Sequence, residues 1–223
     1  YNFYRATKMA TQNKLWAGMA KETAHQIGTP LSSLIGWLEI LKLDNVEEST
    51  IVEIEKDITR LQTITDRFSK IGSEPVLEKR DVIEDTKNTV DYLQTRVSQQ
   101  VVFTFKAPQQ PIYVEINPAL HSWTIENLVK NAIDAMKGKG SLNIVISELE
   151  DKVKISITDT GKGIPKNQFS KVFEPGFTTK KRGWGLGLSL TKRIVQEYHK
   201  GKIKVANSEI SKGTTMQISY KTT

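Results

Sequence analysis

The sequence predicts a two-part fold: an α-helical hairpin over residues 1–72 pairs into a dimeric four-helix bundle, and an α/β sandwich with a mixed sheet follows over residues 73–223. Two observations predict it. Apolar residues in the first third of the chain recur at spacings of three and four, which places them on one helix face. In the remainder, short runs of alternating apolar residues, typical of strands, are interleaved with helical segments.

The first helix is expected from about Lys8 to Leu43, where no pair of glycine or proline residues stops the apolar pattern. Pro30 lies inside this helix and has no N–H to donate to the carbonyl of Gln26, so we expect a bend there. A leucine face runs along the second half of the helix, as in the seam of a coiled coil. Its members are Leu31, Leu34, Leu38 and Leu41.

The second helix is expected from Ile51 to Ile71, after a turn that contains Asp44, Asn45 and Ser49. At about 1.5 Å per residue the first helix would be about 54 Å long, and a lone hairpin of that length cannot bury its apolar stripe. The hairpin should therefore pair with a second copy to form the bundle.

A change of pattern near residue 73, with Gly72 and Pro75 beside it, marks the start of the second domain. Helices are expected there over residues 82–99, 118–136 and 188–199. Strands are expected over residues 101–107, 111–116, 142–150, 152–160, 202–209 and 214–221. Their irregular alternation predicts one mixed sheet covered by helices.

Composition excludes several kinds of protein. The chain has no cysteine, so it has neither disulfides nor thiol chemistry, which suits the cytoplasm. It contains no apolar run of about 18 residues and no apolar leader. The net charge of +7 comes from lysines scattered among acidic residues, so nucleic acid is not an expected partner.

Because the chain begins at Tyr1, we expect an upstream sensor or membrane segment that would make this the cytoplasmic part of an anchored sensor.

Two short motifs of the second domain carry chemistry. In "ENLVKNAIDAM", Asn127 and Asn131 are four residues apart, so both amides lie on one helix face and can offer oxygens to a hard cation and its phosphates. In "DTGKGIP", Asp159 ends a strand and can accept a hydrogen bond from an amino group. Gly161 and Gly163 follow it and let the backbone approach a flat ring closely.

A third motif, "FEPGFTTKKRGWGLGLS", places Gly183, Gly185 and Gly187 just before an apolar helix. Free backbone N–H groups and a helix N-terminus at this point can cradle phosphates. Each motif alone is weak, since the asparagines could be an ordinary polar face and the glycines a flexible loop. In this order and spacing, the three motifs together predict an adenine nucleotide site.

At this point the chain resembles the sensor histidine kinases of two-component systems. "NLVKNA" looks like their N box, "DTGKG" their G1 box, "FEPGF" their F box and "GWGLGL" their G2 box. The segment "HQIGTPLSSL" looks like the H box of their dimerisation and phosphoacceptor domain. The resemblance covers nearly the whole chain and implies ATP and Mg²⁺ as cofactors.

The resemblance also implies roles for individual residues. Asn131 would bind magnesium, Asn127 would lie beside the phosphates, and Asp159 would hold the adenine amino group. Phe173 and Phe177 would anchor a mobile lid. The base pocket would be shaped by Gly161, Gly163 and Ile164, and the phosphates would be closed over by Gly183, Gly185, Leu186, Gly187 and Leu188.

One departure from the family pattern concerns the phosphates. Many members carry a lysine three residues after the magnesium asparagine, whereas this chain has Asp134. The phosphate contact must then come from elsewhere, and Lys180 or Arg182 in the lid is our candidate.

The same nucleotide fold serves gyrase-type topoisomerases, heat-shock chaperones and mismatch-repair ATPases, in which a glutamate four residues before the magnesium asparagine activates water. Here that position is Asn127, and Glu126 points about 100° away on the helix. Water attack then lacks its general base. ATP should be bound and reserved for another nucleophile.

That nucleophile is expected to be His25, because neutral imidazole is a good nucleophile near pH 7. Thr29 lies one helical turn later and, by the resemblance, could orient a water that removes the phosphate. Gln26 stands where the family commonly has an acidic residue, which puts the usual general base in doubt. His121 and His199 are expected to be ordinary surface histidines, with His199 ending a helix.

The sequence therefore predicts a homodimeric protein histidine kinase core that phosphorylates His25 from ATP and passes the phosphoryl group to an aspartate on a response-regulator receiver domain. Two other functions stay open. One is a kinase-weak dimeric scaffold or phosphatase, in which Gln26 has removed the base. The other is an ATP-hydrolysing switch of the topoisomerase and chaperone kind.

Overall fold

The computed structural model describes residues 27–28, 30–43, 46–71, 75–180 and 185–223. The chain divides into two compact units, Tyr1–Pro75 and Val76–Thr223. This division falls three residues after residue 72, where the sequence predicts the first domain to end. Within the residues just given, no helix combines the length and the apolar character that crossing a bilayer requires.

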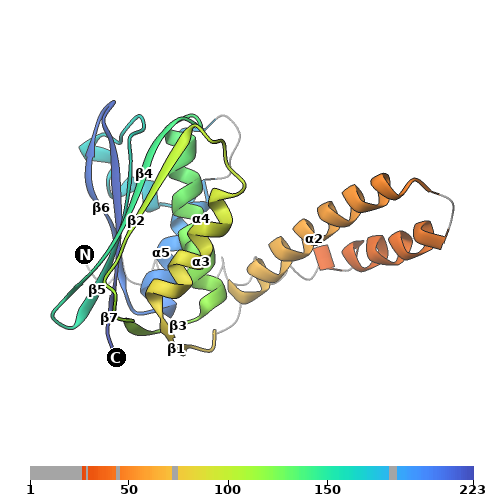
Figure 1. Cartoon of the computed structure of the whole chain (residues 1–223), viewed down its shortest axis with the longest axis horizontal. Helices are drawn as coiled ribbons and strands as arrows, with labels where there is room; N and C mark the ends of the chain where they lie inside the picture. Colours follow the sequence, from red (N-terminus) through yellow and green to blue (C-terminus); the bar gives the residue numbers. More distant parts are fainter. Residues whose placement is uncertain (1–26, 29, 44–45, 72–74, 181–184) are drawn as a thin grey trace, which may run out of the picture. The chain divides into compact units, whose positions relative to one another are not determined.

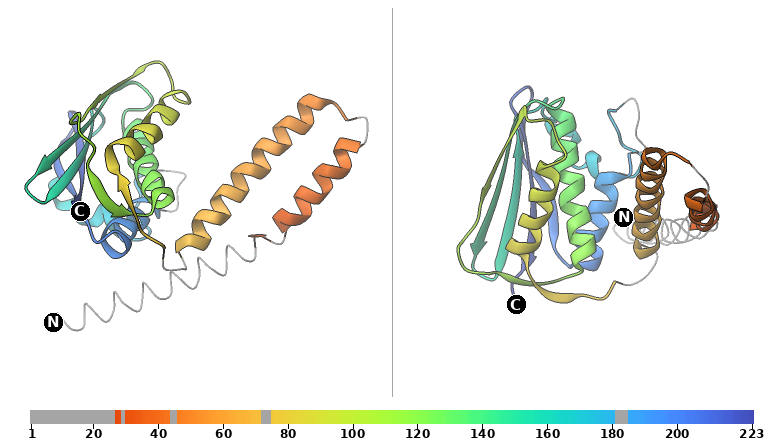
Figure 2. Two further views of the ribbon diagram at one scale, coloured as in Figure 1. Left: turned by 60° about the horizontal axis from the view of Figure 1, so that its bottom comes forward. Right: turned by 45° about the vertical axis from the view of Figure 1, so that its right-hand side comes forward.

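The described part of the first unit is a helical hairpin. Residues 30–43 are helical and run beside helix α2 (Glu48–Ile71), as Figure 2 shows. Leu31 and Leu38 are buried with Ile58 of α2 in a small apolar cluster between the two helices. Across the same hairpin, Lys42 Nζ lies 2.6 Å from Glu55 Oε1. The helices of the predicted bundle are therefore present, within a single copy of the chain.

The second unit is built on a five-stranded sheet with the strand order β2-β4-β5-β7-β6. Strands β2 and β4 are parallel and the other neighbours are antiparallel, so the predicted mixed sheet is confirmed. Every second residue is buried along β5 and from Leu142 to Ile146 in β4, as expected where one face of a sheet carries the core. The strands are β2 (Val101–Lys106), β4 (Gly140–Leu149), β5 (Lys152–Asp159), β6 (Lys202–Glu209) and β7 (Gly213–Lys221).

Three helices cover one face of this sheet, as Figure 1 shows. They are α3 (Val82–Gln94), α4 (Pro118–Ala135) and α5 (Gly187–Arg193). Helix α4 lies against the sheet through Ile125, Leu128 and Val129, none of which is more than 1% exposed. Two short 3-10 helices, η1 (Lys166–Gln168) and η2 (Lys171–Phe173), lie between β5 and α5 in the sequence.

A second sheet was not predicted. Strand β1 (Glu78–Asp81) pairs antiparallel with β3 (Tyr113–Ile116), so the segment predicted as a strand at residues 111–116 is not part of the large sheet. The prediction of one sheet is wrong on this point. The sequence of β1, EKRD, has no apolar alternation, and its strand conformation depends on its pairing with β3.

The start of helix α4 is held by Asn117 in three ways. Its Oδ1 accepts from the N–H of Leu120 at 3.1 Å, which caps the helix. Its Nδ2 donates to the carbonyl oxygen of Val76 at 3.0 Å, and its backbone N–H donates to His199 Nε2 at 3.1 Å. Asn117 thus joins the start of α4 to Val76, the first residue of the unit, and to His199, at the end of the last helical segment of the chain.

The prediction that His121 and His199 are surface residues is wrong: they are 0% and 5% exposed. Helix α5 continues into a π-helical turn, η3 (Ile194–Tyr198), in which the N–H of His199 bonds the carbonyl of Ile194, five residues back. Such a turn contains one residue more than an α turn, so the direction of the following side chain differs from that of a continuous α-helix. His199 does end the helical segment, as predicted.

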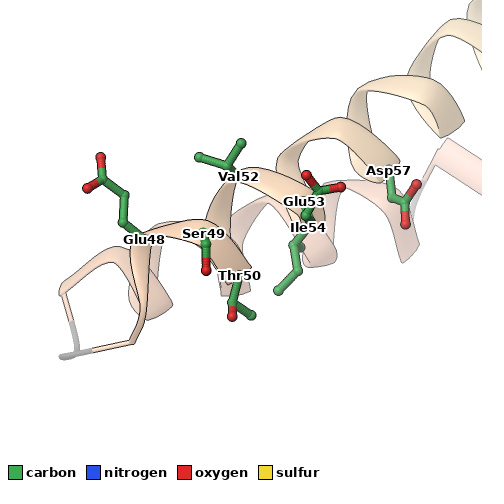
Figure 3. A pocket seen from close by; sticks show the side chains of 7 residues that line it. All are labelled: Glu48, Ser49, Thr50, Val52, Glu53, Ile54 and Asp57. Atoms are coloured by element: carbon green, nitrogen blue, oxygen red, sulfur yellow. The ribbon is translucent and has the colours of Figure 1, made fainter.

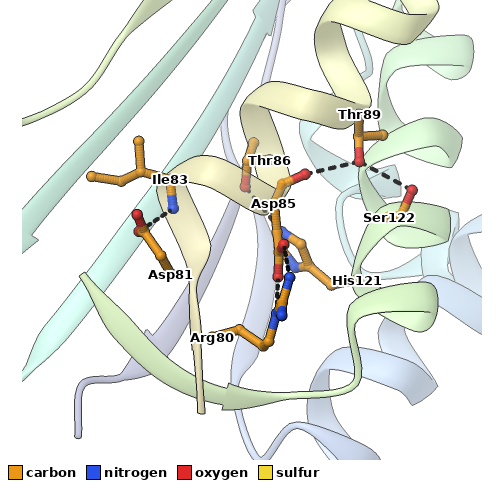
Figure 4. A network of polar contacts seen from close by, with 8 residues as sticks. All are labelled: Arg80, Asp81, Ile83, Asp85, Thr86, Thr89, His121 and Ser122. Atoms are coloured by element: carbon orange, nitrogen blue, oxygen red, sulfur yellow. Dashed lines mark hydrogen bonds and ion pairs between the residues drawn. The ribbon is translucent and has the colours of Figure 1, made fainter. Parts of the chain in front are cut away.

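His121 belongs to a polar network between α3 and α4, drawn in Figure 4. Its Nε2 lies 2.9 Å from Thr86 Oγ1, and its Nδ1 lies 3.3 Å from the Tyr220 hydroxyl. Asp85, the residue before Thr86 on α3, accepts two hydrogen bonds from the guanidinium of Arg80, at 2.8 and 3.1 Å. Buried polar side chains are tolerated here because partners satisfy them.

Candidate nucleotide site

The two asparagines of α4 lie on one face of the helix, but their amides have different partners. Asn127 Nδ2 donates to the carbonyl oxygen of Gly187 at 2.9 Å and to Thr191 Oγ1 at 3.1 Å. It therefore fixes α4 to the first turn of α5. Asn131 Oδ1 instead accepts from the Nζ of Lys180 at 2.9 Å.

Asp159 ends strand β5 and is only 5% exposed. Burial raises the pKa of its carboxyl above the ordinary value, and hydrogen bonds from the backbone N–H groups of Gly161 and Thr214 act in the opposite direction. The bond from Gly161 is 2.7 Å long. An acceptor held this rigidly in a partly desolvated place is suited to bind an amino group of a flat ligand.

Glycines let three backbone segments meet beside Asp159. A Cβ on Gly161 would lie 2.6 Å from the carbonyl carbon of Ala135, at the end of α4. Gly163 has a φ of +73°, and a Cβ there would collide with the carbonyl oxygen of Glu209. Only glycine fits such approaches. The turn after β5 is thus packed between the end of α4 and the turn after β6.

The residues that flank this turn are ordered by polar and apolar contacts. The N–H of Ile164 donates to Ser208 Oγ at 2.7 Å. Phe173 is 7% exposed and belongs to the core of the domain, while Phe177 is partly buried against that core. Both phenylalanines therefore pack on the core, and their role as anchors of a lid stays a prediction.

The described part of the lid lies close to α4. Lys180 Nζ donates to Asp134 Oδ2 at 2.6 Å as well as to Asn131, so the structure brings the predicted phosphate-binding lysine to the predicted magnesium ligand. The N–H of Gly176 donates to the carbonyl of Gly185 at 3.0 Å, so these two glycines lie side by side. Gly187 starts helix α5, with Leu186 before it and Leu188 after it.

Several predicted functional residues lie outside the described residues. They are His25, Gln26 and Thr29 of the first helix, and Arg182 and Gly183 of the lid. Their roles stay predictions. The bend expected at Pro30 likewise depends on residues outside this part of the chain.

A magnesium ion fits the chemistry at Asn131. An amide oxygen is a hard ligand that Mg²⁺ accepts, and the Lys180 ammonium already places a positive charge at that oxygen. Across the described ranges, no group of three or more His, Cys, Asp or Glu side chains could hold a metal on its own. Mg²⁺ commonly takes one or two protein ligands and fills its other positions with waters and substrate phosphates.

A surface hollow of about 710 Å³ lies elsewhere, along the first turns of α2 in the helical hairpin, as Figure 3 shows. It contains none of the predicted nucleotide-binding residues. Three carboxylates line it, and these would repel the phosphates of a nucleotide. The lining residues are Glu48, Ser49, Thr50, Val52, Glu53, Ile54 and Asp57.

The second unit is similar to a family of nucleotide-binding proteins. Residues 120–223 match the family described as histidine kinase-, DNA gyrase B-, and HSP90-like ATPase. The second unit of the chain is therefore similar to this ATPase family over residues 120–223. Among solved structures, the ATPase domain is similar to the catalytic domain of histidine kinase ThkA, at 27% identity and a TM-score of 0.59 over 65% of this chain and 95% of that one.

Similarity also extends beyond the ATPase domain. Sporulation kinase E of Bacillus subtilis is 32% identical over 90% of this chain and 28% of its own length. Sensor histidine kinase ZraS of Escherichia coli is 30% identical over 96% of this chain and 46% of its own length. The chain thus spans less than half of these relatives. A structure of histidine kinase ThkA in complex with response regulator protein TrrA matches all of this chain and 66% of that one, at 26% identity and a TM-score of 0.63.

Some residues around the predicted site were not anticipated from the sequence. Thr191 Oγ1 accepts a hydrogen bond from Asn127 Nδ2. Gly213 lies so close to Asp159 that a Cβ on Gly213 would overlap the carbonyl oxygen of Asp159. Ser208 joins the turn after β5 to strand β7. These are single small residues far apart in the sequence, and only the folded sheet brings them together.

Proposed function

We propose that the chain is the catalytic core of a sensor histidine kinase, which transfers the γ-phosphoryl group of ATP to His25 and then to an aspartate of a response-regulator receiver domain. The ATPase-family domain and the names of the relatives support this proposal. The complex of ThkA with a response regulator supports the choice of partner. The proposed location is the cytoplasm, as part of a membrane-anchored sensor.

The observation that favours a kinase over a hydrolase is the amide at position 127. A hydrolase of this superfamily would need a carboxylate there to activate water. Asn127 cannot act as a base, and its Nδ2 is engaged by Gly187 and Thr191. Glu126 is paired with Lys130 at 2.6 Å, so its carboxylate already has a cationic partner.

In the proposed site, Asp159 binds the adenine amino group, and Gly161, Gly163 and Ile164 shape the base pocket. Magnesium bound with ATP would neutralise charge that develops on the phosphates during transfer. Asn131 would be its protein ligand, and Lys180 or Arg182 would contact a phosphate. The phosphates would be enclosed beside the start of α5 by Gly183, Gly185, Leu186, Gly187 and Leu188.

His25 would attack the γ-phosphorus through a neutral ring nitrogen. Gln26 would fix the tautomer of the ring, and Thr29 would orient the water that later removes the phosphate. Positioning of these groups, more than covalent chemistry by the protein, supplies most of the catalysis in phosphoryl transfer.

The proposed active species is a homodimer. Apolar side chains on one side of the first helix remain exposed in a single copy of the hairpin: Leu34 is 45%, Trp37 is 64% and Ile40 is 50% exposed. A second hairpin would cover this stripe and complete a four-helix bundle. The exposed stripe supports the proposal because isolated soluble chains rarely leave such side chains in a row in water.

Incubation with γ-labelled ATP and magnesium tests the proposed function. Label on the protein that is stable to alkali and labile to acid, and that is lost in His25→Ala, is the expected result. Nucleotide binding without label would indicate a kinase-weak scaffold or phosphatase. Steady release of phosphate from a chain that takes up no label would indicate a hydrolysing switch and would overturn the proposal.

A further inference from the structure

The Lys180 ammonium bridges two oxygens that lie one turn apart on α4. Its Nζ lies 2.9 Å from Asn131 Oδ1 and 2.6 Å from Asp134 Oδ2. The side chains of Lys180 and Asp134 are 44% and 55% exposed, so the ion pair lies at the surface of the domain. The oxygen that is proposed to bind magnesium therefore already has a cationic partner from the protein.

The segment around Lys180 is held at further points. Lys162 Nζ, in the turn after β5, donates to Thr179 Oγ1 at 2.8 Å. The N–H of Lys180 donates to Thr178 Oγ1 at 3.1 Å. Residues Thr178 to Lys180 are thus fixed both to the turn that contains Gly161 and Gly163 and to α4, which makes the bridge part of an ordered arrangement.

We propose that Asp134 is a positioning residue that keeps Lys180 on Asn131 while the site holds no nucleotide, and that Lys180 must leave this oxygen before it can bind magnesium. This inference rests on the proposed function. The ammonium and a magnesium ion cannot share one amide oxygen, because both are cations and would repel each other at that distance. Once released, Lys180 becomes available to a phosphate of the bound nucleotide.

The carboxylate at position 134 has a clear consequence for affinity. The attraction between this carboxylate and the Lys180 ammonium holds Lys180 in place while no nucleotide is bound. This contact must be broken when magnesium and ATP bind. Exposed ion pairs are weak, so the contact can be broken readily, and its loss corresponds to a change of up to about fivefold in a dissociation constant. Asp134 therefore reduces the apparent affinity for magnesium and ATP by a small factor.

The test measures binding of a non-hydrolysable ATP analogue to the full chain by calorimetry at several magnesium concentrations. We expect Asp134→Asn to tighten binding about two- to fivefold and to lower the magnesium concentration needed for half-maximal binding. In a Lys180→Met background, the same substitution should change neither quantity. In the nucleotide-free chain, hydrogen exchange of the Thr178–Lys180 amides should be faster in Asp134→Asn than in the parent.

Asp91→Asn is the matched control, because Asp91 forms a similarly exposed pair with Lys87 on α3. It should leave ATP binding unchanged. An equal gain from Asp134→Asn with and without Lys180 would show a general charge effect and overturn the inference, and so would an absence of any gain. Either result leaves the proposed kinase function intact if the parent still labels His25, whereas a parent that binds no analogue would refute the proposed function itself.

Discussion

The backbone N–H of Asn117 donates a hydrogen bond to Nε2 of His199, with 3.1 Å between the two nitrogens. That nitrogen must therefore be unprotonated. Burial lowers the pKa of His199 to about 3, with a smaller contribution from His121. Burial also lowers the pKa of His121 to about 4. Both imidazoles are neutral in the folded domain over the physiological range of pH.

The first prediction concerns acid stability. Below pH 6.5 the unfolded chain binds protons at these histidines, whereas the folded domain does not until about pH 4 or lower. The free energy of unfolding therefore falls as the pH drops from 6.5 towards 4. Each histidine accounts for about 1.4 kcal/mol of this loss per pH unit. His199→Gln keeps an acceptor for Asn117 without this titration.

We therefore expect the free energy of unfolding of His199→Gln to fall less steeply between pH 6.5 and 4 than that of the parent, by about 1.4 kcal/mol per unit. Urea unfolding followed by the NMR methyl signals of Ile155 and Ile157 in β5 reports on this domain alone. The comparison concerns slopes, so a uniform loss of stability in the variant does not affect it. Equal slopes would contradict the pKa assigned to His199.

The second prediction separates stability from binding at Asp159. Asp159→Asn removes a buried charge while its remaining oxygen can still accept from Gly161. Because burial raises the pKa of this carboxyl, ionisation costs more in the fold than in the unfolded chain, and we expect the variant to unfold at a Tm at or above that of the parent. Binding of ATP should be lost, since an amide cannot replace the charged acceptor for the adenine amino group.

Calorimetry with ATP and GTP, together with thermal unfolding, checks this prediction. The parent should prefer ATP, because guanine presents an oxygen where adenine presents an amino group. Equal affinity of the parent for ATP and GTP would exclude Asp159 from base recognition.

The third prediction uses two glycines with similar backbone conformations. Gly138 and Gly163 have φ values of +77° and +73°, so alanine is strained at both. At Gly138 a Cβ meets nothing within 4 Å, and Gly138→Ala should cost only about 1–2 kcal/mol. At Gly163 it would collide with the carbonyl of Glu209, so Gly163→Ala should cost clearly more and also abolish ATP binding. Similar losses of unfolding free energy in urea would refute the close packing at Gly163.

The fourth prediction concerns Gln26, which lies outside the described residues. A glutamine can fix the tautomer of His25, but it cannot offset the positive charge that develops on the ring as the phosphorus–nitrogen bond forms. We expect Gln26→Glu to speed labelling of His25, by a factor within the roughly 10²- to 10⁴-fold range of general-base assistance, and Gln26→Ala to slow it. Single-turnover labelling at saturating ATP isolates the chemical step. If Gln26→Glu is no faster, Glu22 becomes the candidate for this role.

The fifth prediction concerns dimerisation. Leu34→Glu places a charge in the exposed apolar stripe of the hairpin, and burial of that charge between two copies would be costly. We expect the parent to sediment as a dimer at micromolar concentration and the variant to shift towards monomer, with helicity retained by circular dichroism. A monomeric parent would rule out the bundle.

Strand and helix positions in the second unit could be predicted from the sequence where the apolar pattern was strong. The alternation in β4 and β5 follows directly from a sheet with one buried face. Strand β1 could not be predicted, because all four of its residues are charged and its conformation depends on a partner some 35 residues later. The burial of His121 could not be predicted either, since its partners Thr86 and Tyr220 are distant in the sequence.

The residues of the candidate site could be predicted from the motifs, but their hydrogen-bond partners could not. The spacing of Asn127 and Asn131 places both on one face of a helix, but spacing does not reveal that Asn127 binds the first turn of α5. The lid sequence suggested Lys180 as a phosphate ligand, whereas its contact with Asp134 depends on how the lid lies in three dimensions. Local patterns identify side chains, and their partners come from the tertiary fold.

Asn117 has a mechanical consequence for the domain. The residue that caps α4 also binds the carbonyl oxygen of Val76, the first residue of this unit. Asn131 lies on the same helix, about 21 Å further along at about 1.5 Å per residue. A helix packed along a core moves as a rigid rod, so tension in the chain ahead of Val76 would act on Asn131 without crossing a loop. The attachment point of the domain and its proposed cation ligand are thus two ends of one stiff element.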